Sequence, residues 1–363
     1  MRKGCCMYTS WESPSEPRAH WGRRYKALFI SAILGMALLA AMVWIASPTA
    51  VLARLGALGP WGIASFLASS FLSFLCGVQG WRCLLQVYVG PNRFTQTLGI
   101  MAGGYAVGYL TPTLHLGGEP VRAVLASQGF STPGHEVVAT IIIEKLLYLV
   151  GVTTLLIMGG VIGLRWELPP ALRQGVLSFA GTAAAVVGTT LVGIARRATW
   201  ASRCSGFVLR FLPKWAWLKQ ASGALERTER EASRALLEDH GKAALKAAVF
   251  IFLSVGLSVI APLIFFAFAY GRILSPGELA LFFALSTMFS LFSWLTPGAI
   301  GIAEGAYAGI FKIMGLPMEG AVAFALAQKA AALPIVGLGL VYLSRRGVDW
   351  FGRIRGKACP SVR

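Results

Sequence analysis

Two short sets of acidic and basic residues recur in this chain at nearly the same spacing. The first set comprises Glu119, Arg122, Glu144 and Lys145, and the second comprises Glu304, Gln328 and Lys329. In each set the first glutamate lies seven residues after a proline, and the lysine follows that glutamate by 26 residues in the first set and 25 in the second. Matched spacing of matched residue types indicates an internal repeat.

The charged residues of both sets lie within apolar stretches, which limits what they can be doing there. An ionised side chain inside a bilayer costs about 2.5 to 3.5 kcal/mol on insertion scales, so such residues mark ligand sites by default. We expect Lys145 and Lys329 either to pair with the glutamate of their own set or to bind an anionic group such as a phosphate. For Glu119 and Glu304 a structural role at the start of a helix is an equal alternative.

Each set follows a stretch in which proline and glycine interrupt an apolar run. The residues predicted to break the helices are Pro112, Gly117 and Gly118 in the first stretch, and Pro297, Gly298 and Gly301 in the second. Irregular backbone at membrane depth is tolerated only where it is buried in protein or lines a water-filled cavity. The helix that restarts after each break would direct free N–H groups and its positive dipole end at that cavity, which favours an anionic ligand.

The elements that must position these residues are membrane-spanning helices. Hydrophobic residues make up 56% of the 363 residues and charged residues 13%, well below the roughly 25% of a soluble domain. Runs long enough to span a bilayer are predicted at 26–46, 61–81, 137–164, 174–195, 245–270 and 321–343. The interrupted stretches, 97–130 and 278–316, are predicted to be re-entrant hairpins rather than spans.

The distribution of basic residues decides the predicted topology. Residues 196–246 carry eleven Lys or Arg, and the leader and the tail are basic too, so all three are predicted to be cytoplasmic. They can share one side only if each interrupted stretch enters and leaves on the same side, the first from the cytoplasm and the second from the opposite side. The two halves then have inverted topology, as in many translocators.

This topology divides the chain into four predicted parts. Residues 1–25 form a cytoplasmic leader that stays attached to an uncleaved signal anchor, and residues 26–165 form the first membrane repeat. Residues 171–346 form the second repeat, whose basic loop 196–246 lies on anionic headgroups, and residues 347–363 form a basic cytoplasmic tail. The net charge of +18 is thereby explained without a nucleic-acid partner.

Several classes of enzyme are excluded by missing motifs. The chain has two aspartates and therefore no Asp-x-Asp nucleotide-sugar site, and it has neither a Walker A loop nor a Gly-x-Ser-x-Gly elbow. No cysteine pair or histidine cluster has the spacing of a metal site. We therefore expect no metal, no cofactor and no enzymatic activity.

The motifs resemble those of the family that includes the transmembrane region of lysylphosphatidylglycerol synthase and its stand-alone, flippase-like relatives, some of them linked to hopanoids or glycolipids. The residues that carry the resemblance are Pro112 through Gly118-Glu119 to Arg122, the pair Glu144-Lys145, and Pro297-Gly298 with Gly301 and Glu304. The resemblance implies a multi-pass protein of the bacterial inner membrane that binds and translocates an anionic or modified lipid. Lysine at 145 and 329, where arginine is commoner, departs from the family pattern. The cytosolic aminoacyl transferase domain of the full synthases is not present in this sequence, so lysyl transfer is not expected.

The leading hypothesis from sequence is a lipid translocator that binds the headgroup in a cavity at the midplane of the bilayer, with membrane lipids as its partners. The first alternative is a membrane-embedded enzyme acting on a lipid headgroup with Glu119 or Glu304 as general base, although no nucleophile, base and orienting residue occur together. The second alternative is a scaffold subunit for a lipid-modifying enzyme.

Overall fold

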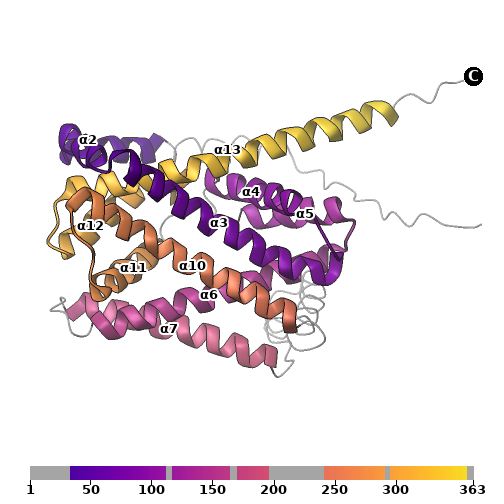
Figure 1. Ribbon diagram of the computed structural model, residues 1–363, viewed down its shortest axis with the longest axis horizontal. Helices are drawn as coiled ribbons and strands as arrows, with labels where there is room; N and C mark the ends of the chain where they lie inside the picture. Colours follow the sequence, from indigo (N-terminus) through magenta and orange to yellow (C-terminus); the bar gives the residue numbers. More distant parts are fainter. Residues whose placement is uncertain (1–32, 112–116, 164–169, 196–240, 291–294, 358–363) are drawn as a thin grey trace, which may run out of the picture.

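The computed structural model describes residues 33–111, 117–163, 170–195, 241–290 and 295–357. Every regular element in these ranges is a helix. In chain order the labelled helices are α2 (Pro48–Ala57), α3 (Gly59–Val89), α4 (Phe94–Leu110), α5 (Gly118–Phe130), α6 (Gly134–Gly163), α7 (Pro170–Ala195), α10 (Gly241–Tyr270), α11 (Pro276–Ser290), η2 (Pro297–Ala299), α12 (Ile302–Ile313) and α13 (Met318–Lys357) (Figure 1).

The structure confirms an all-helical, multi-pass membrane protein. Five of the described helices are long and apolar enough to cross a membrane, namely α3, α6, α7, α10 and α13. A sixth span is counted if the helix Ile33–Ile45 and α2 are taken together. The five single helices correspond to five of the six predicted spans, and the helix Ile33–Ile45 covers the described part of the sixth, predicted at 26–46. The predicted leader 1–25, the segment 196–240 of the basic loop and the end of the tail from residue 358 lie outside the described residues, as does Pro112.

Helix α2 was not expected from the sequence and forms a sharp elbow with the helix before it. The two axes differ by 85°, and the bend occurs at Ser47, which has a φ of 63°. Pro48 then starts α2, at a helical position where its missing N–H costs nothing. Trp44 and Trp61, on either side of α2, are both 80% exposed. Exposed tryptophans are typical of the boundary between lipid and water, so α2 has the character of an interfacial helix.

The two interrupted stretches form helical hairpins with short arms. The arms α4 and α5 have 17 and 13 residues, and α11 and α12 have 15 and 12. At a rise of 1.5 Å per residue even α4 is about 25 Å long, less than the roughly 30 Å of a hydrocarbon core. The α4–α5 hairpin lies toward one end of the bundle and the α11–α12 hairpin toward the other (Figure 1). This arrangement agrees with hairpins that enter from opposite sides.

Equivalent helices of the two halves make equivalent packing contacts, each with the hairpin of the other half. The most extensive contact joins α3 to α10, the helices that follow the first span of each half. Helix α13 of the second half packs on α4 of the first hairpin, and α6 of the first half packs on α11 of the second hairpin. Within each half, the returning arm packs on the following span, as α5 does on α6 and α12 on α13. An inverted repeat produces this pattern.

The first hairpin is held together by a close approach of backbone to backbone. A Cβ atom on Gly118 would collide with the carbonyl oxygen of Gly104, on the opposing arm, and a Cβ on Gly104 would collide with the side chain of Arg122. Only glycine permits this distance between α4 and α5. The contact fixes the start of α5, and therefore the position of Glu119 and Arg122, relative to α4.

The second hairpin rests on an aromatic core. Phe324 of α13 contacts the rings of Phe265, Phe282 and Tyr307, at centroid distances of 5.1, 5.2 and 4.9 Å. All three contacts are edge-to-face, which is a favoured geometry for aromatic pairs. The second hairpin is thus packed against α10 and α13 by large rigid side chains, whereas the first relies on glycine.

Candidate functional site

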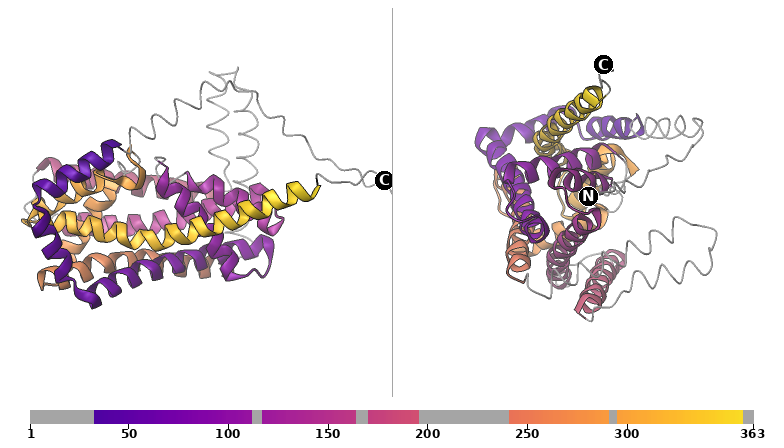
Figure 2. Two further views of the ribbon diagram at one scale, coloured as in Figure 1. Left: turned by 90° about the horizontal axis from the view of Figure 1, so that it is seen from above. Right: turned by 90° about the vertical axis from the view of Figure 1, so that its right-hand side faces the viewer.

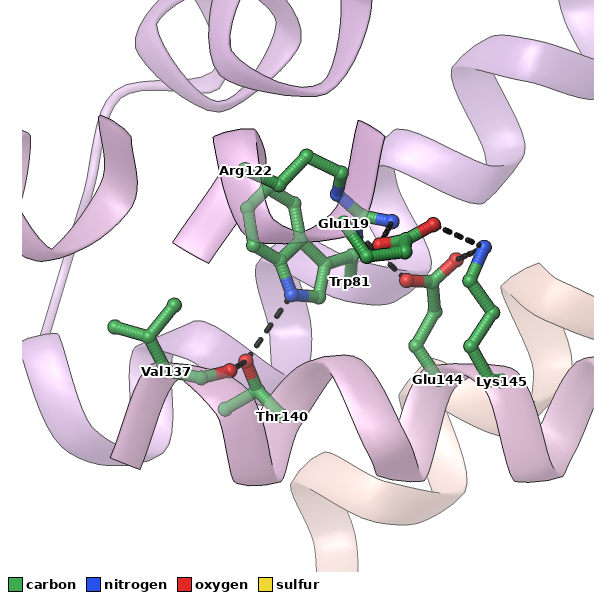
Figure 3. A network of polar contacts seen from close by, with 7 residues as sticks. All are labelled: Trp81, Glu119, Arg122, Val137, Thr140, Glu144 and Lys145. Atoms are coloured by element: carbon green, nitrogen blue, oxygen red, sulfur yellow. Dashed lines mark hydrogen bonds and ion pairs between the residues drawn. The ribbon is translucent and has the colours of Figure 1, made fainter. Parts of the chain in front are cut away.

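The first set of predicted residues forms one network of four charges (Figure 3). The Lys145 Nζ lies 2.8 Å from Oε1 of Glu119 and 3.8 Å from Oε1 of Glu144. Arg122 donates to Oε2 of Glu119 at 2.8 Å and to Oε2 of Glu144 at 2.7 Å. Helices α5 and α6 therefore bring together two basic and two acidic groups, and the formal charge of this network is zero.

Arg122 is the buried centre of the network. Its side chain is 3% exposed, and its guanidinium lies over the ring of Trp81, 4.2 Å from the ring centroid. Trp81 is held in turn, because its indole N–H donates to Oγ1 of Thr140 at 3.1 Å while the Thr140 hydroxyl donates to the carbonyl of Val137 at 2.7 Å (Figure 3). Arg122 is therefore positioned to orient the two glutamates rather than to meet a ligand.

Lys145 is the accessible member of the network. Its side chain is 46% exposed and, with Glu144 and Tyr148, it lines a cavity of about 350 Å³, which we call the Lys145 cavity. Helices α3 and α10 contribute a polar wall to this cavity, formed by Ser70, Ser73, Ser254 and Ser258. A cavity that presents a lysine, a glutamate and several hydroxyl groups suits the polar part of a lipid.

The second set forms a simpler and more deeply buried pair. The Lys329 Nζ lies 2.9 Å from Oε1 of Glu304, whose side chain is fully buried. The other carboxylate oxygen of Glu304 accepts a hydrogen bond of 2.8 Å from the backbone N–H of Gly301, the residue that precedes α12. Gly301 has a φ of 82°, which a residue with a side chain rarely adopts. The amide that was expected to face an anionic ligand is thus paired with a carboxylate of the protein.

Lys329 lines a second cavity, of about 230 Å³, which we call the Lys329 cavity. Its wall includes Gly298 from the second break and Tyr109 from α4. Tyr105, Gln328 and Ala332 line both cavities, so the two cavities adjoin across these side chains. The predicted residues of the two repeats therefore converge on one region inside the bundle.

Some predicted residues line the cavities directly and others do not. Glu144, Lys145, Gln328, Lys329 and Gly298 line them. The remaining predicted residues that the structure describes (Glu119, Arg122, Glu304, Gly117, Gly118, Pro297 and Gly301) support these positions through ion pairs or backbone geometry. The prediction that Gly117 and Gly118 break the helix was wrong: Gly117 has helical backbone and Gly118 is the first residue of α5. Gly298 and Gly301, in contrast, have positive φ.

Sequence reasoning missed the four serines and Trp81. The serines carried a usable signal, since Ser70 and Ser73 lie three residues apart, and Ser254 and Ser258 four apart, within apolar spans. Such spacing puts both members of a pair on one helix face. Trp81 carried no comparable signal, because one aromatic residue in a span is ordinary.

One family profile, described as the lysylphosphatidylglycerol synthase TM region, matches residues 32–339. The chain belongs to this family. No curated protein and no solved structure matches it. The matched residues include both hairpins, both lysine–glutamate pairs and both cavities. Family membership confirms the resemblance inferred from the motifs and relates the protein to membrane lipids in general.

Proposed function

We propose that the protein binds the phosphate-bearing headgroup of a membrane lipid in the two adjoining cavities and moves it across the bilayer, with the acyl chains left in the membrane. One observation carries the proposal: each half of the chain places a lysine, paired with the glutamate of its own hairpin, at one of two cavities that share a wall.

Lys145 can leave its ion pairs in the first network and bind a ligand at little cost in free energy. Glu119 and Glu144 are both hydrogen bonded to Arg122, so they keep a cationic partner when Lys145 turns to a phosphate. A buried carboxylate left without any partner would be strongly unfavourable. This arrangement supports a role for Lys145 as the group that first contacts the headgroup.

The second pair would release its lysine less easily. Glu304 is fully buried, and without Lys329 it would retain only the hydrogen bond from Gly301. The Lys329 side chain is 17% exposed, against 46% for Lys145. We therefore assign the state described here to a protein in which Lys145 is accessible to a headgroup and Lys329 stays paired with Glu304.

Transfer between the sites would use the inverted repeat. Hairpins at opposite ends of the bundle can open one cavity at a time if the two halves rock against each other. Charge distribution supports an inner-membrane location with both termini in the cytoplasm, because the 196–246 segment and the tail are strongly basic. Helix α13 extends beyond the bundle at the α4–α5 end (Figure 2), so in this topology the first hairpin opens toward the cytoplasm.

Reconstitution with labelled lipids tests the proposal. The purified chain in proteoliposomes should accelerate transbilayer exchange of a labelled phospholipid, and the double variant Lys145→Ala, Lys329→Ala should abolish the acceleration. The matched control is Lys242→Ala, Lys312→Ala, which removes two exposed lysines that line neither cavity. Equal exchange by the wild type and the cavity variant would refute the proposed roles. Extraction of the lipids after the assay would reveal a modified product if the protein were instead an enzyme.

A further inference from the structure

The charge balance of the Lys145 cavity restricts which headgroup it can hold. Arg122 and Lys145 are balanced by Glu119 and Glu144, so the network is neutral before a ligand enters. A headgroup with net negative charge would bring an uncompensated charge in between membrane-spanning helices, which is costly. A headgroup whose phosphate is balanced by a cation of its own would not.

The serine wall of the Lys145 cavity offers hydrogen-bond acceptors rather than donors. The Ser73 hydroxyl donates to the carbonyl of Ser254 at 2.8 Å, and the Ser254 hydroxyl donates to the carbonyl of Ser73 at 2.7 Å. Ser70 and Ser258 each donate to a carbonyl of their own helix, at 3.0 and 2.6 Å. A hydroxyl has a single proton to donate, so all four are in use and the oxygen lone pairs remain for a ligand.

Glu144 adds a carboxylate oxygen to the same cavity. Its Oε2 accepts from Arg122, whereas its Oε1 has Lys145 at 3.8 Å, which is beyond hydrogen-bond distance. This oxygen is therefore available to a donor that enters the cavity. The cavity thus presents one cationic donor, Lys145, together with an anionic acceptor and several hydroxyl acceptors.

We infer that the Lys145 cavity selects a zwitterionic lipid headgroup that carries a phosphate and an N–H-donating ammonium, in preference to a headgroup with net negative charge. The phosphate binds Lys145, and the ammonium binds Oε1 of Glu144 and the serine oxygens. The inference rests on the proposed function and narrows its ligand.

Competitive binding of three phospholipids with identical acyl chains tests this inference on the full chain in detergent micelles. Phosphatidylethanolamine has both required groups, phosphatidylcholine has the charge balance without N–H donors, and phosphatidylglycerol has net negative charge. We expect phosphatidylethanolamine to bind about fivefold more tightly than phosphatidylglycerol, with phosphatidylcholine between them. Phosphatidylglycerol binding as tightly as phosphatidylethanolamine would overturn the inference. Soluble phosphoethanolamine should compete with the lipid and inorganic phosphate should not; competition by phosphate alone would also overturn it.

A charge variant provides the second arm of the test. Glu119→Gln removes one negative charge from the network and should shift the binding ratio about fivefold toward phosphatidylglycerol. The matched control is Glu319→Gln, a carboxylate that pairs with Arg54 at 3.8 Å and lines neither cavity. An unchanged ratio in Glu119→Gln would contradict the charge argument.

A serine variant isolates the acceptor wall. The double variant Ser70→Ala, Ser258→Ala removes two hydroxyls that bond only within their own helices, so helix packing should be retained. The double variant should weaken the binding of phosphatidylethanolamine and leave the binding of phosphatidylcholine unchanged. An equal loss of affinity for both lipids would contradict recognition of the ammonium group.

The outcomes separate the two proposals. Exchange that depends on Lys145 together with a preference for phosphatidylglycerol would retain the translocation function and reject zwitterion selection. If the rate of exchange is the same with and without Lys145 and Lys329 for every lipid, the proposed function itself is rejected.

Discussion

Ser73 on α3 and Ser254 on α10 exchange hydrogen bonds, each hydroxyl donating to the backbone carbonyl of the other residue at 2.8 and 2.7 Å. A reciprocal exchange is what a local two-fold axis between two helices produces. Helices α3 and α10 hold equivalent places in the two halves, so this pair marks the point where the halves meet at the Lys145 cavity.

The Ser73–Ser254 pair should contribute measurably to the α3–α10 interface. In a double-mutant cycle of Ser73→Ala and Ser254→Ala we expect a coupling free energy of about 0.6 kcal/mol, the average for hydrogen bonds between membrane helices. Unfolding in mixed micelles monitored by circular dichroism would measure it. Ser69→Ala, which removes a hydroxyl bonded only to its own helix, is the control and should show no coupling with Ser254→Ala. Strict additivity of the Ser73 and Ser254 substitutions would show that the exchange contributes nothing.

The Glu304–Lys329 pair should behave as a unit in stability. Removing one partner leaves a charge uncompensated in a buried place, so Glu304→Gln should lower the free energy of unfolding by about 3 kcal/mol. The double variant Glu304→Gln, Lys329→Met removes both charges and should recover part of that loss. Thermal unfolding of the purified variants in one detergent would measure both effects. A double variant less stable than Glu304→Gln would be incompatible with a compensated ion pair.

Gly118 should be intolerant of a side chain. Gly118→Ala places a methyl group against the carbonyl of Gly104, and the resulting separation of α4 and α5 should destabilise the protein by about 1 to 3 kcal/mol. Gly256→Ala is a suitable control, because a Cβ on this helical glycine meets nothing within 4 Å. It should be neutral or stabilising by up to about 1 kcal/mol, since alanine favours a helix more than glycine does. Equal melting temperatures for the two variants would argue against the close approach.

Trp81 should influence the first site through Arg122. Trp81→Leu removes the ring beneath the guanidinium, and we expect a loss of stability of about 3 kcal/mol, of which about 1 to 2 kcal/mol comes from the cation–π contact. The same change at the exposed Trp61 is the control and should have little effect on stability. Lipid binding at the Lys145 cavity should weaken only in Trp81→Leu, if Arg122 does orient the two glutamates. If a folded Trp81→Leu protein binds lipid as well as the wild type does, Arg122 does not have that positioning role.

Most of the architecture could be predicted because it follows from local composition and from charge. Apolar runs of sufficient length located the spans, and the basic segment 196–246 required an even number of crossings, from which the hairpins followed. The pairing of Lys145 with Glu119, and of Lys329 with Glu304, was one of two alternatives that the matched spacing suggested, and both pairs are present.

The parts that could not be predicted depend on contacts between distant segments. Arg122 was expected at the ligand, but Trp81, 41 positions earlier, covers it, and no local pattern links the two residues. Gln328 lines both cavities, and its position on their shared wall depends on how α13 packs between the hairpins. The elbow before α2 was missed because α2 has only ten residues, too few to establish a helical period in the sequence.

The elbow at Ser47 has a consequence for the membrane around the protein. As an interfacial helix between Trp44 and Trp61, α2 sets the position of one bilayer surface along the bundle. The hairpin arms are too short to reach the other surface if the bilayer becomes thicker. A thicker bilayer would then cover the mouth of the first hairpin with acyl chains. Lipid exchange should therefore fall as the host acyl chains are lengthened from 16 to 22 carbons, which liposomes of graded chain length would measure. A rate of lipid exchange that does not change with acyl-chain length would mean that α2 does not set the depth of the protein in the bilayer.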